Sequence, residues 1–252
     1  LHARLEHLFQ GVHLNTKVMG LKDLESAIEV KLDGPEGERS EQFDRVLVSV
    51  GRRPNSGDIG LEKTKVQIND RGFVVVDDRQ RTADPHILAI GDVAGEPMLA
   101  HKASHEGKVA VESLHGGPAA FDPLAIPAIV FTDPEIAWAG LTEDQAKRDN
   151  RAVEVARYPW GASGRAQALG RTEGFTKLLI DPESERIVGI GIVGPGAGEL
   201  VAEGVLAIEM GCSVRDLTDS IHPHPTLSET LAFAGETFFG IATEIYKPRR
   251  ER

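Results

Sequence analysis

Cysteine is almost absent from this 252-residue chain, which contains only Cys212. A disulfide framework within the chain is therefore excluded, and so is a Cys-x-x-Cys redox pair. We expect Cys212 to be a small buried apolar residue at a helix end, as free cysteines often are. The scarcity of cysteine also favours a reducing compartment, which we take to be the cytoplasm, or the mitochondrial matrix in a eukaryote.

Positive charge is also scarce, with 28 Lys and Arg against 39 Asp and Glu and a formal net charge of −11. A nucleic-acid partner would need a basic face, and an anionic membrane surface would repel this chain. No apolar run approaches the ~20 residues of a membrane span, and no signal peptide opens the chain. We therefore expect neither nucleic acid nor a membrane as a partner.

The hydrophobic pattern predicts two kinds of architecture, separated by prolines at 118, 123 and 127. Before them, a helix is expected over residues 1–10 and another over 98–115, with strands at 12–14, 16–19, 27–32, 45–50, 72–77 and 86–92. After them, strands are expected at 128–131, 135–138, 153–158, 174–180 and 186–193, with helices at 142–150, 198–210 and 226–239. We predict an α/β part followed by an α+β part, with domains at 1–53, 54–122 and 123–252.

The most informative segment is residues 221–230, Ile-His-Pro-His-Pro-Thr-Leu-Ser-Glu-Thr. Proline fixes its own φ and keeps the preceding residue out of the α region, so His222 and His224 should lie on rigid, extended backbone. An imidazole held in this way suits proton transfer, because histidine titrates near neutral pH. Glu229 has two interpretations: it orients a histidine, or it forms a capping box with Thr226. The spacing leaves both open.

A second candidate site follows the strand expected at 86–92, which ends in Gly91 and Asp92. Ligands in α/β sheets bind beyond the carboxyl ends of the strands, where a carboxylate can accept hydrogen bonds from a polyol. Gly91 allows close approach of a ligand, and the helix expected from Met98 offers a positive dipole end. The alternative is an ordinary strand–turn–helix connection in which Asp92 caps a loop.

Two further features are weaker. Gly51, in Gly-Arg-Arg-Pro-Asn, either contacts a ligand at a strand end or forms a turn between domains. His101 and His105 lie four residues apart on an expected helix, as a metal-binding pair would. No acidic or cysteine ligand follows them in a zinc pattern, so we predict no metal site.

Three motifs, taken in order, resemble the flavin-dependent pyridine nucleotide–disulfide oxidoreductases: Val50-Gly-Arg-Arg-Pro-Asn55, Thr82-Ala-Asp-Pro-His-Ile-Leu-Ala-Ile-Gly-Asp92 and His222-Pro-His-Pro-Thr-Leu-Ser-Glu229. The last motif is most similar to the branch that oxidises dihydrolipoamide with NAD in 2-oxoacid dehydrogenase complexes. The glutathione and mercuric reductases share the architecture but differ around the histidine. The resemblance implies remnants of doubly wound NAD-binding (1–53) and FAD-binding (54–122) domains, then an α+β interface, or dimerisation, domain (123–252).

The resemblance also implies a role for each candidate residue. His224 would be the general base that deprotonates dihydrolipoamide and later reprotonates the leaving thiol, and Glu229 would orient it. Asp92 would bind the ribityl chain of FAD, and Val18 and Gly51 would line the NAD site. The backbone near the flavin ring would be that of Met98, Leu99, Ala100 and His101.

The same resemblance implies partners. The protein would be a homodimer in which the histidine of one subunit serves the flavin and disulfide of the other. It would act on dihydrolipoamide carried by the acyltransferase component of a 2-oxoacid dehydrogenase complex.

Parts of the family pattern are expected to lie outside this chain. We expect no Gly-x-Gly-x-x-Gly loop for the FAD pyrophosphate or for NAD, and Cys212 alone cannot supply a redox pair. The first residue is leucine, which suggests the C-terminal portion of a longer enzyme. We expect this portion alone to lack dehydrogenase activity and to bind FAD weakly or not at all. The alternatives are a non-catalytic dimerisation or partner-binding piece and part of a related disulfide reductase.

Overall fold

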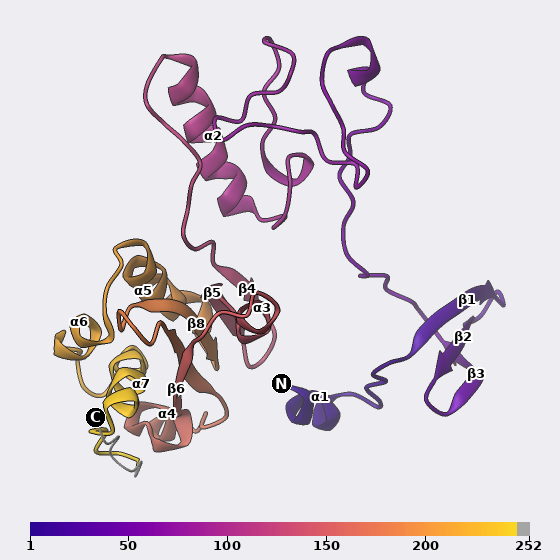
Figure 1. The fold of residues 1–252 in the computed structure, drawn as a ribbon. Coiled ribbons are helices and arrows are strands. Elements are labelled where there is room, and N and C mark those ends of the chain that lie inside the picture. Colours follow the sequence, from indigo (N-terminus) through magenta and orange to yellow (C-terminus); the bar gives the residue numbers. More distant parts are fainter. Residues whose placement is uncertain (246–252) are drawn as a thin grey trace. The chain divides into compact units, whose positions relative to one another are not determined.

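The computed structural model describes residues 1–245 and divides the chain into two compact units, with the division after Arg53 (Figure 1). Among the described residues, no helix is long and apolar enough to cross a membrane. The assignment of the chain to NAD-binding, FAD-binding and interface domains stays a prediction.

The first unit consists of one short helix and a three-stranded antiparallel sheet. The helix α1 spans His2–Leu8, and the strands β1 (Lys17–Asp23), β2 (Ile28–Gly34) and β3 (Gly37–Phe43) pair in that order. Val30 and Leu32 alternate with polar residues on β2 and are its buried side chains. This alternation is the period of two that a half-buried strand requires.

The buried strand expected over residues 45–50 does not form, and the prediction is wrong. Leu47 and Val50 are each 92% exposed, and the segment is irregular. The strand expected at 12–14 is also absent, and those at 72–77 and 86–92 contain only isolated bridges, Ile68–Val74 and Arg81–Leu88. An apolar run becomes a strand only when neighbouring strands satisfy its backbone groups, and no described strand pairs with these segments.

The second unit begins with irregular chain around the 3-10 turns η1 (Leu61–Lys63) and η2 (Gly91–Val93) and the helix α2 (Ala100–Leu114). A five-stranded antiparallel sheet then forms in the order β4-β5-β8-β7-β6. Its strands are β4 (Ala128–Val130), β5 (Ile136–Gly140), β6 (Glu154–Pro159), β7 (Phe175–Ile180) and β8 (Ile187–Val193). All five strands lie close to the ranges expected from the sequence.

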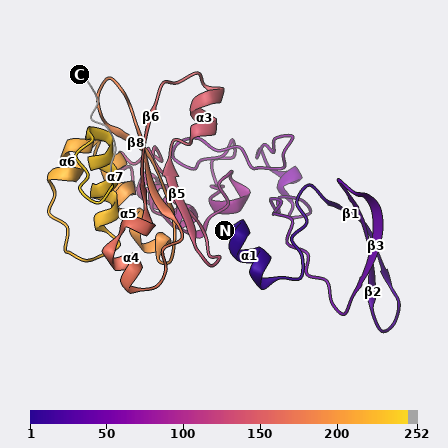
Figure 2. The same ribbon diagram turned by 90° about the horizontal axis from the view of Figure 1, so that it is seen from below.

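The helices of the second unit are α3 (Glu143–Arg148), α4 (Gly164–Ala168), α5 (Ala197–Glu209), α6 (Val214–Asp219) and α7 (Glu229–Phe239), with a 3-10 turn η3 (Trp160–Ala162). Helix α5 packs on β5 and β8, and α7 packs on β6 and β7; Figure 2 shows α5, α6 and α7 together on one side of the sheet. The predicted N-cap of α3 at Thr142 is confirmed, because its hydroxyl accepts from the Gln145 N–H. Helices α4 and α6 were not expected from the sequence. Ser213 and Asp216 form a capping box at the start of α6, which was the available signal for that helix.

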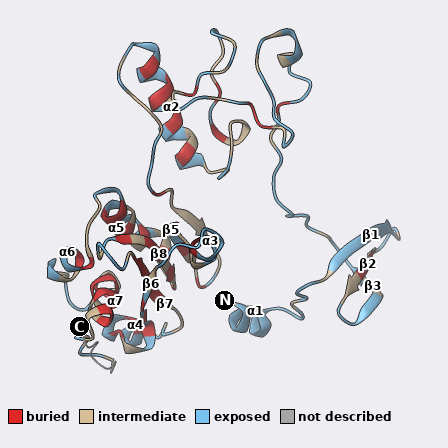
Figure 3. Ribbon diagram, viewed as in Figure 1, coloured by how far each residue is buried: buried red, intermediate tan, exposed pale blue. Residues whose placement is uncertain are grey.

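Buried residues are concentrated on the sheet and on the helices that pack against it, where they form the hydrophobic core (Figure 3). Close approach of α5 depends on Gly204, where a Cβ would lie only 2.3 Å from Ile190 Cδ1. Helix α5 is thereby held directly against β8, which makes it a rigid support for residues on its other faces.

Glycine is required at position 194, where β8 gives way to α5. Gly194 has φ +150°, and a Cβ there would lie 2.1 Å from the Trp160 ring. Trp160 is fully buried and donates its ring N–H to Thr176, so it cannot easily move aside. We expect Gly194→Ala to lower the free energy of unfolding by about 1–3 kcal/mol, the usual cost of overpacking, measured by urea denaturation of the chain.

Gly191→Ala is the matched control, three residues earlier and within β8. A Cβ at Gly191 would meet only Lys177 Cε, at 3.7 Å, so its effect on unfolding should be close to zero. Equal losses in the two variants would show that contact with Trp160 is not what selects glycine at 194.

Candidate functional site

His224 and Glu229 form a hydrogen-bonded pair at the start of α7. His224 Nδ1 lies 2.9 Å from Glu229 Oε2. The Glu229 side chain is only 4% exposed, whereas that of His224 is 73% exposed. An ionised carboxylate can only accept, so Nδ1 donates and the neutral ring keeps its lone pair on Nε2. The pair therefore presents a proton-accepting nitrogen at the surface, supported from behind by a buried carboxylate.

Glu229 also serves the turn that precedes α7, so its two interpretations from the sequence are compatible. Its Oε1 accepts from the Thr226 N–H at 3.3 Å, which is one half of the expected capping box. The other half is wrong: the Thr226 hydroxyl donates to the Pro223 carbonyl, and the N-cap is Ser228. The helix starts three residues later than expected, because the Thr226 hydroxyl is engaged in the turn before it.

A chain of buried hydrogen bonds anchors the same end of α7 to the sheet. Trp160 Nε1 donates to Thr176 Oγ1 at 3.0 Å, and this oxygen lies 2.7 Å from Thr230 Oγ1. Thr230 Oγ1 in turn donates to the Leu227 carbonyl at 2.6 Å. Thr176 and Thr230 are both fully buried, and their pairing avoids the cost of burying unsatisfied hydroxyls. The sequence alone gave no sign of this network, since its members are far apart in the chain.

Tyr158 lies on β6, the strand against which α7 packs, and its ring contacts that of Phe233 on α7. Burial raises the pKa of its hydroxyl, and the negative charges of Glu244, Glu229 and Glu236 raise the pKa further. The hydroxyl is buried and has no hydrogen-bond partner among the described residues. Burial, followed by the charge of Glu244, likewise raises the pKa of Glu236. The Tyr158 phenol thus stays protonated and neutral near Glu229.

The turn that carries Asp92 is held by a buried ion pair that the sequence analysis missed. Glu106 Oε2 accepts from the Gly91 N–H at 2.6 Å, and Glu106 Oε1 lies 2.6 Å from Lys102 Nζ. Lys102 Nζ also donates to the Gly95 carbonyl at 3.3 Å. Both ends of the turn are therefore fixed to α2, with Asp92 between them.

This pair lies on the buried face of α2. The Lys102 and Glu106 side chains are about 5% exposed, whereas Val111 and Leu114 are 57% and 62% exposed. A buried charge is tolerated when it is paired and hydrogen-bonded. The i,i+4 spacing of Lys102 and Glu106 was the available signal, but it is normally typical of a solvated face.

The residues of this turn fit the ribityl chain and ring of a flavin. Gly91 has φ +75°, and a Cβ there would lie 3.1 Å from Ala103 Cβ, so the turn requires glycine. Helix α2 begins at Ala100 after Leu99, without a side-chain cap, which suits backbone contacts to an electron-rich ligand. The Asp92 carboxylate supplies the acceptor that a polyol needs. The FAD roles of Asp92 and of the segment from Met98 to His101 stay predictions.

The other candidate residues are placed as follows. Val18 lies on β1 and is 61% exposed, and Gly51 lies in irregular chain with φ +117°; their NAD role stays a prediction. His101 Nε2 lies 2.7 Å from the Pro127 carbonyl oxygen, whereas the His105 ring packs against Phe121. The described part of the chain contains no cluster of three or more potential metal ligands.

Residues 189–194 match the Gly-x-Gly-x-x-Gly pattern. The expectation that the chain lacks this sequence pattern is therefore wrong. Gly189 and Gly191 lie inside β8 and pair with both neighbouring strands. The following helix α5 receives the Glu135 carboxylate at its N-terminus, through the Gly198 N–H at 2.9 Å. A negative charge is already present there, so this stretch does not offer a phosphate-binding loop.

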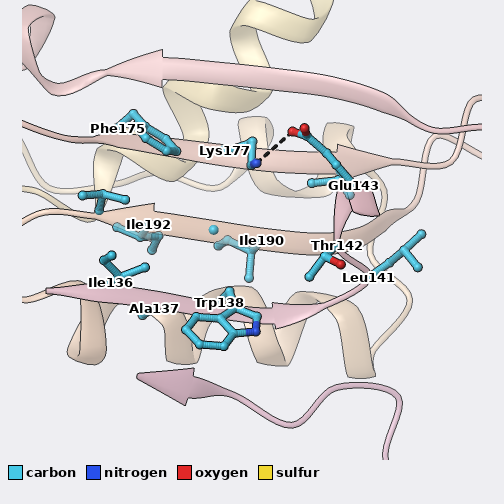
Figure 4. A pocket seen from close by; sticks show the side chains of 13 residues that line it. Ile136, Ala137, Trp138, Leu141, Thr142, Glu143, Phe175, Lys177, Ile190 and Ile192 are labelled. Atoms are coloured by element: carbon cyan, nitrogen blue, oxygen red, sulfur yellow. Dashed lines mark hydrogen bonds and ion pairs between the residues drawn. The ribbon is translucent and has the colours of Figure 1, made fainter. Parts of the chain in front are cut away.

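A hollow of about 210 Å³ lies elsewhere, on the sheet formed by β5, β8 and β7 (Figure 4). At its edge, Lys177 Nζ donates to Glu143 Oε1 at 2.8 Å, and this hydrogen bond lowers the pKa of Glu143. None of the predicted site residues lines this hollow.

Comparison with known families places the chain. Residues 3–107 match the model described as pyridine nucleotide-disulphide oxidoreductase, and residues 126–234 match its dimerisation domain. Together the two matched ranges cover most of the sequence and share one family.

Curated relatives agree with these matches. The dihydrolipoyl dehydrogenase of Vibrio parahaemolyticus is 48% identical over 233 residues, which is 92% of this chain and 49% of the relative. That of Thermus scotoductus is 45% identical, over 97% of this chain and 53% of the relative. The mitochondrial dihydrolipoyl dehydrogenase of Caenorhabditis elegans is 44% identical, over 86% and 44%. The chain thus spans about half the length of the curated relatives it matches.

Solved structures point the same way. LpdA from Mycobacterium tuberculosis superposes with a TM-score of 0.81 at 25% identity, over 89% of this chain and 48% of that protein. The HOCl-induced flavoprotein disulfide reductase RclA from Escherichia coli gives 0.76 at 26% identity, over 85% and 49%. The family models, the curated relatives and these structures agree: the chain belongs to the pyridine nucleotide-disulphide oxidoreductase family.

Proposed function

We propose that this chain is the C-terminal part of a dihydrolipoyl dehydrogenase, here called the parent enzyme, and that it supplies the catalytic base and the dimer interface. The observation that carries the proposal is the His224–Glu229 pair, in which an exposed imidazole has its Nδ1 2.9 Å from a buried carboxylate. A base oriented by a carboxylate is the arrangement that thiol deprotonation needs. The 48% identity to a dihydrolipoyl dehydrogenase supports this substrate class.

In the proposed reaction, dihydrolipoamide and NAD⁺ give lipoamide, NADH and a proton. His224 Nε2 accepts a proton from one substrate thiol, and the resulting imidazolium is stabilised by Glu229. The thiolate attacks a disulfide of the parent enzyme, forming one S–S bond and breaking another. His224 then returns the proton to the thiolate that leaves. FAD bound at Asp92 and α2 would pass the two electrons on to NAD⁺.

The parent enzyme is proposed to be a homodimer, in which His224 of one subunit faces the disulfide and flavin of the other. Residues 126–234 match a dimerisation domain. Apolar side chains of this matched range are uncovered, with Ile221 100%, Leu206 62% and Met210 71% exposed. These apolar surfaces suit burial against a second copy. Docking to an acyltransferase component, in the cytoplasm or the mitochondrial matrix, belongs to the same proposal.

A related disulfide reductase is the second candidate, and the likeness to RclA favours it. RclA is 26% identical to this chain, well below the 44–48% of the dihydrolipoyl dehydrogenases. We therefore rank the related reductase behind a dihydrolipoyl dehydrogenase. Turnover of the parent enzyme with dihydrolipoamide, glutathione disulfide and mercuric ion separates the two. The chain alone should reduce no NAD⁺. Turnover by the chain alone with stoichiometric FAD would contradict the expectation that part of the active site lies outside it.

Glu229→Gln in the parent enzyme tests whether Glu229 orients the base or only caps α7. The amide keeps a hydrogen-bond acceptor but loses the charge that stabilises the imidazolium, so kcat should fall about 100-fold, as for a misplaced catalytic group. Its melting temperature should change little. Steady-state kinetics and calorimetry measure the two quantities.

Ser228→Ala is the control, since Ser228 is the N-cap residue but makes no capping hydrogen bond. It should leave kcat unchanged. If Glu229→Gln cost about 1 kcal/mol of stability but little rate, the residue would be a cap alone.

A further inference from the structure

His222, the first histidine of the His-Pro-His-Pro segment, is bonded at both ring nitrogens. Its Nδ1 lies 2.9 Å from the Ser220 carbonyl oxygen, and its Nε2 lies 2.7 Å from Glu203 Oε1. Its side chain is 10% exposed, against 73% for His224. Two histidines separated by one proline therefore occupy opposite environments.

The two partners of His222 bear on the protonation state of its ring. A backbone carbonyl oxygen and an ionised carboxylate can only accept hydrogen bonds, so both ring nitrogens must donate. A neutral ring can donate at one nitrogen only, so both contacts are satisfied together only by an imidazolium paired with the Glu203 carboxylate. His224 contacts a carboxylate at Nδ1 alone and keeps a lone pair. Both ring nitrogens of the first histidine are therefore engaged, whereas the second histidine has one such contact, at Nδ1.

Glu203 lies on a helix that is packed against the sheet, so it can hold the His-Pro-His-Pro segment in place. It lies on α5 beside Gly204, where the absence of a Cβ allows α5 to pack directly on β8. The segment is held at its other end by Glu229 and by the Thr230 hydrogen bond to Leu227. His224 lies between these two attachments.

We propose that His222 and Glu203 are positioning residues: an imidazolium–carboxylate pair that ties the loop bearing His224 to α5. This inference rests on the proposed role of His224 as the base. It assigns His222 no proton transfer of its own. Without the pair, the loop would lose its attachment to α5, and His224 would be displaced from its partner thiol.

The protonation state can be tested on the 252-residue chain, independently of the reaction. Two-dimensional ¹H–¹⁵N spectra of the histidine rings at neutral pH should show both His222 nitrogens protonated and His224 protonated at Nδ1 alone. Glu203→Gln should convert His222 to a neutral ring and leave the His224 pattern unchanged. A neutral His222 ring in the unaltered chain would overturn the proposal.

The positioning role is tested in the parent enzyme by Glu203→Gln, with Glu199→Gln as the matched control. Glu199 is an exposed carboxylate one turn earlier on α5. We expect kcat per bound flavin to fall about tenfold to 100-fold in Glu203→Gln, with KM for NAD⁺ unchanged, and no change in Glu199→Gln. Normal kcat in Glu203→Gln would overturn the positioning role. If His224→Ala also kept full activity, the proposed function itself would fail, whereas full activity in Glu203→Gln alone would remove only the present inference.

Discussion

Replacing His224 by alanine in the parent enzyme should lower the rate of dihydrolipoamide oxidation by about 10²–10⁴-fold, the usual contribution of a positioned base. The physical reason is that Nε2 is the exposed acceptor of a ring whose Nδ1 is engaged by Glu229 at 2.9 Å. No other histidine of residues 221–230 can replace it, since His222 is bonded at both nitrogens. Stopped-flow and steady-state kinetics with dihydrolipoamide and NAD⁺ measure the loss.

The flavin spectrum and the melting temperature of His224→Ala should remain those of the unaltered enzyme, because the ring is 73% exposed and packs against little. Oxidation of NADH by an artificial electron acceptor, which requires no thiol deprotonation, serves as the control and should persist. A variant that lost both activities equally would place His224 in the fold or the cofactor site rather than in proton transfer.

Glu106→Gln should lower the free energy of unfolding by about 3–5 kcal/mol, the cost of leaving one member of a buried ion pair without its partner charge. Lys102 and Glu106 are 5% and 4% exposed and lie 2.6 Å apart. Glutamine can still accept from the Gly91 N–H, so the loss reports the uncompensated Lys102 charge. Urea denaturation of the chain measures it, and the flavin spectrum of the parent enzyme reports whether the Asp92 turn is disturbed.

The double variant Lys102→Met/Glu106→Gln is the matched control. Removing both charges should restore most of the stability, because a buried pair replaced by uncharged residues of similar volume is often neutral. A double variant as unstable as Glu106→Gln would show that the uncompensated charge of Lys102 does not account for the loss.

Much of the second unit could be predicted from the sequence, because its strands, turns and helix starts are marked by patterns of only a few neighbouring residues. The strands β5 to β8 alternate or run apolar over a few residues, and turns such as Asp181-Pro-Glu-Ser separate them. Thr142 and Gln145 mark the start of α3 by a side chain that reaches only three residues. In residues 45–50 the same local pattern failed, because a strand requires hydrogen-bonding neighbours that no described segment provides.

The candidate site divides in the same way. The His-Pro-His-Pro segment indicated both histidines and Glu229 as candidates, and the family resemblance singled out His224. The structure places His224 Nδ1 2.9 Å from Glu229. The sequence could not separate the two histidines by their contacts. That separation depends on Glu203, nineteen residues before His222 and on another helix.

By itself, the sequence indicated two candidate sites: an imidazole near a carboxylate on a proline-stiffened segment, and a Gly-Asp turn before a helix. Both are short-range patterns that backbone sterics impose on neighbouring residues. Only the tertiary structure decided which histidine ring is exposed and which is buried, and what holds the Gly91–Asp92 turn. These outcomes depend on buried charges, Glu203, Glu229 and Glu106, whose partners are chosen by packing and by the cost of leaving a buried polar group unpaired.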